Sequence, residues 1–253
     1  MDYRILVTDT QRSGKQEMMK LSVWQENGFA IAGKSSDVKS TVQAASGLDY
    51  DVILCIHRPG DTEAVGLLTA LKKKALTIPV LILSIQEDAE CMRECFLLGC
   101  VDFMTEPLTE HDIHTALVRV SRQLSEQYKN REYAIALRKS LGQLQENGVQ
   151  EGVIEKLQDF YQHSGNDTVT TETASEYFGF NKDYFCRYFK MRTGMTFSEF
   201  HKGVQMEYAK LLLQTGHFKV QDVSELLGFS TADYFTRAFK KRVGKTPSEF
   251  KKS

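Results

Sequence analysis

The sequence has no apolar run that approaches the roughly 20 residues of a membrane-spanning helix. Its first residues, MDYRILVTD, lack the basic stretch and apolar core of a secretory signal peptide and are typical of a first β-strand. No segment is low in complexity. These absences predict a folded protein that resides in the cytoplasm and has no membrane partner.

Cysteine is too scarce for a disulfide framework. The chain has five cysteines among 253 residues, an odd number without an export signal, which indicates reduced thiols. The length and a hydrophobic content of 42% allow two domains, each with its own core.

The net charge is only −1, but it is unevenly distributed. Residues 165–253 carry 14 Lys and Arg against 10 Asp and Glu, whereas residues 1–164 carry 18 against 23. A basic C-terminal third joined to an acidic remainder indicates that one part meets a polyanion and the other does not.

The strongest feature is an internal repeat. The segment ASEYFGFNKDYFCRYFKMRTGMTFSEF (174–200) returns as VSELLGFSTADYFTRAFKKRVGKTPSEF (223–250). With one gap placed after Lys182, 16 of the 27 paired positions are identical, which identifies two copies of one structural unit.

Each copy is predicted to form a helix, a tight turn and a second helix. Gly179 and Gly228 permit the backbone conformation of a sharp turn at the end of the first helix. Asn181 and Ser230 are predicted to cap the second helix. This is the helix-turn-helix pattern, in which the second helix enters a DNA major groove.

Aromatic residues in the second helices define a buried face. We expect the following residues to lie in or near the core: Phe185, Phe189, Tyr234, Phe235 and Phe239. Residues 198–216, between the copies, carry an apolar stripe and predict one connecting helix. A rigid connection suits two recognition helices that reach successive major grooves, about 34 Å apart.

The second copy, with its GF…YF.R.FK…G..P..F pattern, resembles the AraC/XylS family of transcription regulators, and the resemblance covers residues from about Glu151 to Lys252. Gln205 stands where the family usually has an arginine. The resemblance implies base contacts by Asn181, Lys182, Asp183, Cys186, Arg187, Thr231, Ala232, Asp233, Thr236 and Arg237. Phosphate contacts are expected of Lys190, Arg192, Lys240, Lys241 and Arg242, which would set register and salt dependence.

Two residue types in these helices have different chemistry toward bases. Arg187 and Arg237 can each donate two hydrogen bonds to guanine, worth about 1–3 kcal/mol of discrimination. Asp183 and Asp233 either accept from a cytosine amino group or cap the helix and repel phosphate, and the sequence does not separate the two roles.

The N-terminal part alternates apolar strands with amphipathic helices. Its strands are YRILVTD, FAIAGKS, DVILCI, PVLILSI and VDFMTEP, which predict a parallel, doubly wound α/β sheet. With local matches at GFAIAGKSSD, YDVILC, IPVLILS and LGCVDFMTEPL, this part resembles the receiver domain of two-component response regulators, a flavodoxin-like (βα)5 fold.

The pocket that such a domain uses for phosphoryl transfer is degenerate here. Ile56 stands at the position of the phosphoacceptor aspartate, and Glu106 stands at the position of a lysine. Asp9 followed by Thr10 replaces a pair of acids, so one carboxylate remains for magnesium, while Ser84 keeps the hydroxyl. We therefore expect this domain to act without phosphorylation.

Other residues of this domain suggest alternatives to a silent scaffold. His57 is an improbable phosphoacceptor, because successive side chains on a strand point to opposite faces. A metal or redox sensor built from Cys91, Cys95, Cys100, His111 and His114 has no standard zinc spacing, and buried thiols are the commoner interpretation. The sequence thus predicts no metal and no cofactor.

The domain boundaries follow from these assignments: a receiver-like domain over 1–125, a helical linker over 126–150 and an all-α domain with two helix-turn-helix motifs over 151–253. Apolar spacing in the linker is compatible with a coiled coil between two chains or with a helix packed on its own domain. QENGVQEG (145–152) is predicted to be a hinge. We expect a homodimer through the receiver-like domain, the linker helix, or both.

The function that these features predict is sequence-specific DNA binding by a transcription regulator. The alternative is a protein-interaction adaptor that docks a kinase or another regulator through the receiver-like domain. An enzyme is not expected, because no nucleophile–base pair, phosphate loop or metal cluster stands out in the sequence.

Overall fold

A computed structural model describes residues 2–9, 20–47, 49–164 and 169–252. The chain divides into two compact units, Met1–Gln127 and Tyr128–Ser253. No helix among the described residues is long and apolar enough to cross a membrane.

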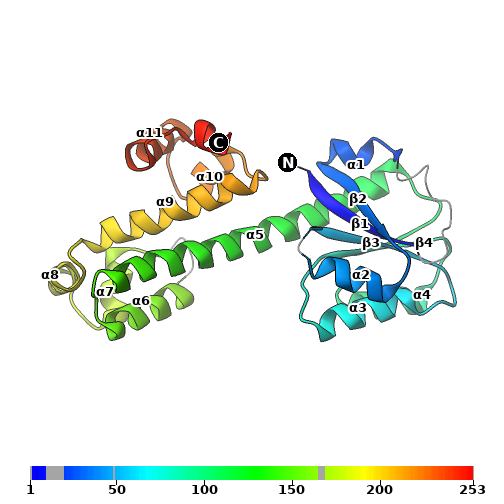
Figure 1. Cartoon of the computed structure of the whole chain (residues 1–253), viewed down its shortest axis with the longest axis horizontal. Helices are drawn as coiled ribbons and strands as arrows, with labels where there is room; N and C mark the ends of the chain where they lie inside the picture. Colours follow the sequence, from blue (N-terminus) through cyan, green and yellow to red (C-terminus); the bar gives the residue numbers. More distant parts are fainter. Residues whose placement is uncertain (1, 10–19, 48, 165–168, 253) are drawn as a thin grey trace. The chain divides into compact units, whose positions relative to one another are not determined.

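The first unit is a parallel sheet covered by helices on both faces (Figure 1). In the described residues the strands run in the order β2-β1-β3-β4-β5, which is the flavodoxin-like arrangement and confirms the predicted receiver-like fold. The strands are β1 (Tyr3–Thr8), β2 (Phe29–Ser35), β3 (Val52–His57), β4 (Val80–Ser84) and β5 (Asp102–Thr105). The helices between them are α1 (Val23–Glu26), α2 (Val38–Ala45), α3 (Glu63–Lys73) and α4 (Ala89–Leu98).

The central strands are buried along their whole length. Every residue of β3 and of β4 is buried, because helices cover both faces of the sheet. This burial explains the continuous apolar rows VILCI and VLIL. It also means that the polar side chains at the ends of these strands, His57 and Ser84, are fully buried at 0% exposure.

Helix α5 (Glu110–Glu146) continues through the boundary between the units. In the first unit it buries Ile113, Leu117, Val120 and Leu124. In the second unit Ala136, Leu137, Leu141 and Leu144 of the same helix belong to the hydrophobic cores. The stretch 128–149, which lies within the predicted linker 126–150, is therefore part of the second unit, and its apolar stripe is covered by its own unit.

The predicted hinge at 145–152 is instead a tight connection within the second unit. Gly148 adopts a φ of +79°, and the Val149 N–H donates to the Leu144 carbonyl at 3.1 Å, so the end of α5 is closed by a hydrogen-bonded turn. Val149 itself is buried at 8% exposure and packs in the core of this unit.

The second unit is all helical beyond α5 in its described residues. Its helices are α6 (Glu151–His163), α7 (Thr171–Phe178), α8 (Lys182–Thr193), α9 (Phe197–Thr215), α10 (Val220–Leu226), α11 (Ala232–Val243) and α12 (Pro247–Lys251). The pairs α7–α8 and α10–α11 are the two repeat copies, and α9 is the predicted connecting helix.

Helix α9 supplies both repeat cores. Phe197, Phe200 and Val204 pack with the aromatic residues of α8, whereas Tyr208 and Leu212 pack with those of α11. Burial along almost the whole length of α9 confirms the apolar stripe read from the sequence.

Two sequence predictions about the second copy are wrong. The N-cap of α11 is Thr231, whose side chain accepts from the Tyr234 N–H at 3.2 Å, and not Ser230. The extra residue of this copy thus belongs in the turn, before the cap. Tyr234, which the sequence places in or near the core, is 55% exposed, because Phe235 and Phe239 are the residues that face inward from this helix.

Candidate nucleic-acid interface

Helix α8 separates a buried aromatic face from an exposed polar face. Phe185 and Phe189 are both 0% exposed, and the Asn181 side chain caps the helix by accepting from the Tyr184 N–H at 2.9 Å. The predicted base-contacting residues Lys182, Asp183, Cys186 and Arg187 are all exposed. The helix is thus anchored by its phenylalanines and presents its polar side chains to solvent.

Lys182 differs from its neighbours because it already has a partner. Its Nζ forms an ion pair with the Glu172 carboxylate of α7, and that contact lowers the pKa of Glu172. Both side chains are more than half exposed, so the pair is weak and DNA phosphate can compete for the lysine.

Helix α11 repeats this arrangement. Phe235 and Phe239 are 0% exposed, while Thr231, Asp233 and Arg237 are exposed and Ala232 and Thr236 are partly exposed. Thus the residues predicted to touch bases lie on the exposed side of each second helix. Two tyrosines are exposed there as well: Tyr184, which the sequence did not single out, and Tyr234, which the sequence placed on the buried face.

The predicted phosphate-contacting side chains lie in the last turns of α8 and α11, and all are exposed: Lys190, Arg192, Lys240, Lys241 and Arg242. At the carboxyl ends of helices these cations also complement the helix dipole. Arg192 is additionally held by its own unit, donating to Gln150 Oε1 at 3.1 Å and lying 5.6 Å from the centre of the Tyr188 ring.

A hollow of about 970 Å³ lies between α9 and the second repeat. Arg237 and Lys241 line it from α11, and Lys202 and Gln205 line it from α9. Gln205, where the resembled family usually has an arginine, therefore faces the same space as Arg237. Gly203 of α9 permits a close approach, since a Cβ there would lie 2.9 Å from Arg242 Nη2.

In the first unit the predicted pocket residues come to one edge of the sheet. Asp9 follows β1, Ile56 lies near the end of β3, and the Glu106 N–H donates to the Ser84 carbonyl at 3.0 Å. Thr10 lies outside the described residues. Ile56 is 1% exposed, and the Ser84 hydroxyl donates to the Gln86 carbonyl at 2.6 Å, within its own loop.

Arg58 is a pocket residue that the sequence analysis did not identify. Its guanidinium Nη2 lies 3.7 Å from Asp9 Oδ1, and both side chains are largely buried. A cation supplied by the chain thus lies beside the one remaining carboxylate. The signal for it was its position two residues after Ile56.

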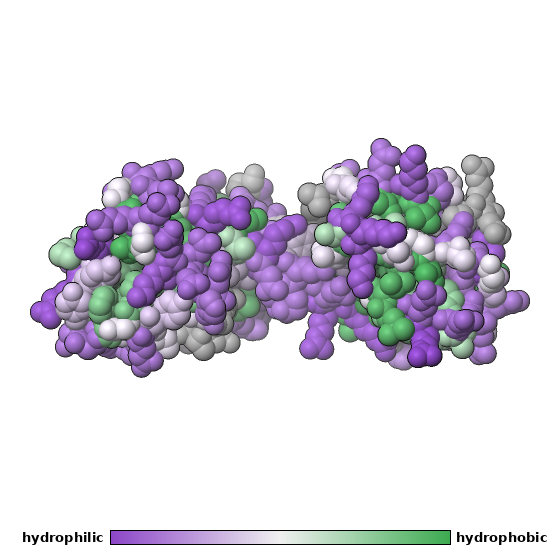
Figure 2. All heavy atoms as spheres, turned by 90° about the horizontal axis from the view of Figure 1, so that it is seen from below, coloured by the Kyte–Doolittle hydropathy of each residue, from purple (hydrophilic) through white to green (hydrophobic). Residues whose placement is uncertain are grey.

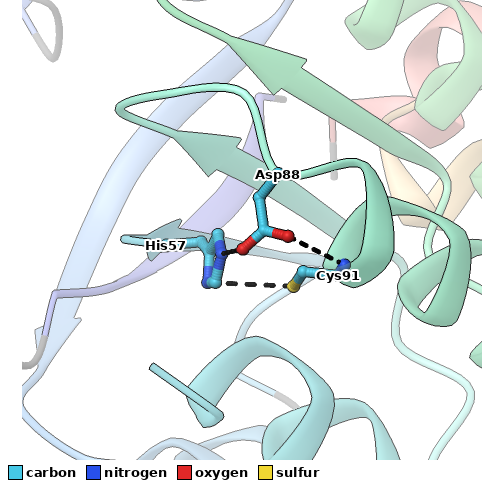
Figure 3. A group of neighbouring side chains, drawn as sticks. All are labelled: His57, Asp88 and Cys91. Atoms are coloured by element: carbon cyan, nitrogen blue, oxygen red, sulfur yellow. Dashed lines mark hydrogen bonds and ion pairs between the residues drawn. The ribbon is translucent and has the colours of Figure 1, made fainter. Parts of the chain in front are cut away.

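The cysteines and histidines that the sequence offers as an alternative metal or redox sensor are only partly brought together. Cys91 and Cys95 are 3.8 Å apart at sulfur, but His114 Nδ1 lies by Asn27 Oδ1 at 2.7 Å and His111 is exposed. The structure instead brings His57 into contact with Asp88 and Cys91 (Figure 3). One indication of this contact was available in the sequence, because strand alternation places the His57 side chain on the face of β3 opposite to that of Ile56.

Comparison with known proteins finds matches to both halves of the chain. Residues 174–253 match the family model described as "Helix-turn-helix domain", which confirms the predicted AraC-type domain. A protein-glutamate methylesterase/protein-glutamine glutaminase of Treponema denticola is 30% identical over 126 residues, which cover 49% of this chain and 33% of that protein. Its counterpart in Treponema pallidum is 28% identical over 125 residues, 49% of this chain and 30% of that protein. The match thus spans about a third of these curated relatives and does not establish their activity here.

Solved structures are similar to parts of the chain. The FixJ-N crystal structure is 23% identical, with a TM-score of 0.42, and covers 48% of this chain and 95% of its own. The C-terminal domain of the two-component response regulator YesN from Fusobacterium nucleatum is 26% identical, with a TM-score of 0.37, over 40% of this chain and 99% of that domain.

The sheet order and the helix-turn-helix match together define the class of the protein. The chain is a DNA-binding transcription regulator with a receiver-like first unit and an AraC-type helix-turn-helix domain.

Proposed function

We propose that this regulator binds a specific DNA sequence through α8 and α11 and that its first unit controls it without accepting a phosphoryl group. The observation that carries the proposal is Ile56, a side chain that offers no nucleophile and is 1% exposed at the position expected of the phosphoacceptor.

The charges around Ile56 support the same conclusion. Arg58 lies beside Asp9 and offers a positive charge where a magnesium ion would need several carboxylate oxygens. Glu106 replaces a lysine and would repel a phosphoryl group. Replacement of the nucleophile alone would therefore not restore transfer.

For DNA recognition we assign base contacts to the exposed faces of α8 and α11, with Arg187 and Arg237 as the guanine-reading side chains. The basic last turns of both helices contact phosphates, with Lys240 as their simplest representative. The buried phenylalanines hold both recognition helices and contact no base.

We further assign self-association to the first unit. The apolar stripe of α5 is covered within the two units, which leaves few side chains for a coiled coil. At the end of α4, Phe96 is 45% and Leu97 is 75% exposed, and Figure 2 shows hydrophobic surface on this unit, on the right of the picture. Burial of such groups against a second copy would stabilise a dimer.

The test of regulation is a genome-wide footprint of the intact protein beside the Ile56→Asp variant, with and without a small phosphodonor. Identical sites and occupancy in all four samples are expected. A shift of occupancy that requires the phosphodonor in the wild-type protein would contradict the proposal.

The test of self-association is the Leu97→Glu variant in sedimentation experiments. We expect it to lower the dimer fraction, whereas Met191→Glu, at a 72% exposed methionine of the second unit, should leave it unchanged. Equal dimer fractions in wild type and Leu97→Glu would remove the first unit from the interface.

A further inference from the structure

Three side chains that can bind metal converge in the first unit, at the carboxyl end of β3 and the amino end of α4 (Figure 3). His57 comes from β3, Asp88 is the N-cap of α4, and Cys91 lies in the first turn of that helix. One ligand atom from each lies within 4.8 Å of the other two. His57 Nε2 and Asp88 Oδ2 are 3.1 Å apart, and Cys91 Sγ is 3.9 Å from His57 Nδ1.

A fourth residue, Asp61, orients the imidazole. Its carboxylate accepts the backbone N–H groups of Arg58 at 3.1 Å and Glu63 at 3.2 Å, and its Oδ1 lies 3.0 Å from His57 Nδ1. A carboxylate held in this way accepts a hydrogen bond from Nδ1–H, and the Nε2 lone pair is then directed toward Asp88. Carboxylates play this role behind metal-bound histidines.

This arrangement sets two acceptors against each other. With the proton on Nδ1, Nε2 of a fully buried ring faces a carboxylate oxygen at 3.1 Å, and both atoms carry lone pairs. A cation between them removes the conflict. A metal ion placed there would also use the thiolate of Cys91.

Asp88 is prepared for such a role. Its Oδ1 accepts from the Cys91 N–H at 3.0 Å and caps α4, so the carboxylate is held in place while Oδ2 points at His57. The cap and the imidazole contact both lower the pKa of Asp88, which keeps it ionised.

We infer that His57 Nε2, Asp88 Oδ2 and Cys91 Sγ form a site for a divalent metal ion of the zinc class, supported by Asp61. One nitrogen, one oxygen and one sulfur ligand suit zinc, with a water molecule at the fourth position. Bonds of about 2.0–2.3 Å put tetrahedral ligand atoms about 3.2–3.8 Å apart. The three ligand atoms lie within 4.8 Å of one another, so they must move closer to share one ion. The ion's two charges are balanced by one carboxylate and one thiolate.

The site differs from the degenerate pocket and does not depend on DNA binding. His57 and Ile56 point to opposite faces of β3. Burial raises the pKa of the Cys91 thiol, so a bound ion must displace its proton and binding must release protons. An ion there would connect the end of β3 to the start of α4, which gives a receiver-like unit without a phosphoacceptor another input.

The experiment uses the full chain with Cys186→Ser, since Cys186 is an exposed thiol that would bind metal by itself. Cobalt(II) titration of the metal-free protein is expected to give a single equivalent with a thiolate-to-cobalt charge-transfer band, and zinc should displace it. Cys91→Ser should abolish the band. Asp88→Asn, which keeps a capping side chain, should weaken binding about tenfold or more.

Matched controls are available in the same unit. Asp37 caps α2 as Asp88 caps α4, so Asp37→Asn should leave cobalt affinity unchanged, and so should Cys95→Ser at the neighbouring buried thiol. The circular dichroism spectrum of each metal-free variant must match that of the parent protein. A variant whose spectrum differs is replaced by another ligand substitution, such as His57→Gln. Absence of stoichiometric binding, or a band that survives both Cys91→Ser and Asp88→Asn, would overturn the site.

Discussion

Arg187 and Arg237 occupy the same position in two equivalent helices. Each is the sixth residue of a helix of 12 residues. Each helix is capped by the side chain of the preceding residue, which accepts a hydrogen bond from the backbone N–H of a tyrosine, the third residue of the helix. Both helices end at a glycine with positive φ, Gly194 or Gly244. The two arginines therefore extend from matching points of two equivalent helices.

This equivalence gives the first prediction. Arg237→Ala should cost about 1–3 kcal/mol of binding at one base position and relax the preference there, because arginine reads guanine by two hydrogen bonds. Lys240→Ala should weaken all sequences alike and reduce the salt slope by about one, because it loses a phosphate contact. Binding-site selection with each variant measures the difference, and equal effects of the two would refute the assigned roles.

The pocket of the first unit gives the second prediction. Incubation with a small phosphodonor should leave the intact mass unchanged in the wild-type protein and also in Ile56→Asp, since Arg58 and Glu106 remain where a metal and a lysine would be needed. Intact mass spectrometry checks both proteins. A stable adduct on the wild type would show that another residue accepts the group.

The N-cap of α11 gives the third prediction, because the structure assigns it to Thr231 whereas the sequence alignment assigns it to Ser230. Thr231→Ala should lower the free energy of unfolding by about 1 kcal/mol, because the Tyr234 N–H loses its acceptor. Ser230→Ala, one residue away, should change it little. Urea titrations of both variants provide the comparison. A larger loss of unfolding free energy from Ser230→Ala would show that Ser230, as the sequence alignment predicts, is the N-cap.

Much of the fold could be predicted from the sequence, because short residue patterns mark its helices and strands. The doubled GF…YF.R.F pattern predicted both helix pairs, and the apolar rows of β3 and β4 predicted a covered parallel sheet. The sequence could not predict which unit residues 126–150 pack against. Helical spacing shows that one face of the helix is apolar, but it does not show which domain covers that face. Likewise, His57 and Cys91 are 34 residues apart, and only the packing of α4 against β3 brings them together.

His201 gives the fourth prediction, on the pH dependence of the second unit. Its ring stacks against the rings of Phe197 and Tyr161, and Nδ1 lies 3.0 Å from the Tyr161 hydroxyl. Burial lowers the pKa of His201 from 6.5 to about 4. Between these pH values the unfolded chain binds a proton at His201 that the folded chain does not bind. The contribution of the neutral His201 ring to the free energy of unfolding is therefore complete above pH 6.5 and is lost as the pH falls toward 4.

The expected loss is about 2–3 kcal/mol, somewhat less than the full shift would give, because the ring is not completely buried. Urea titrations above pH 6.5 and near pH 4 measure it, with His201→Gln as the control that cannot titrate. The variant should lose less stability over this range than the wild type, since other acidic groups titrate equally in both. Equal losses would mean that His201 is protonated in the folded protein with its ordinary affinity.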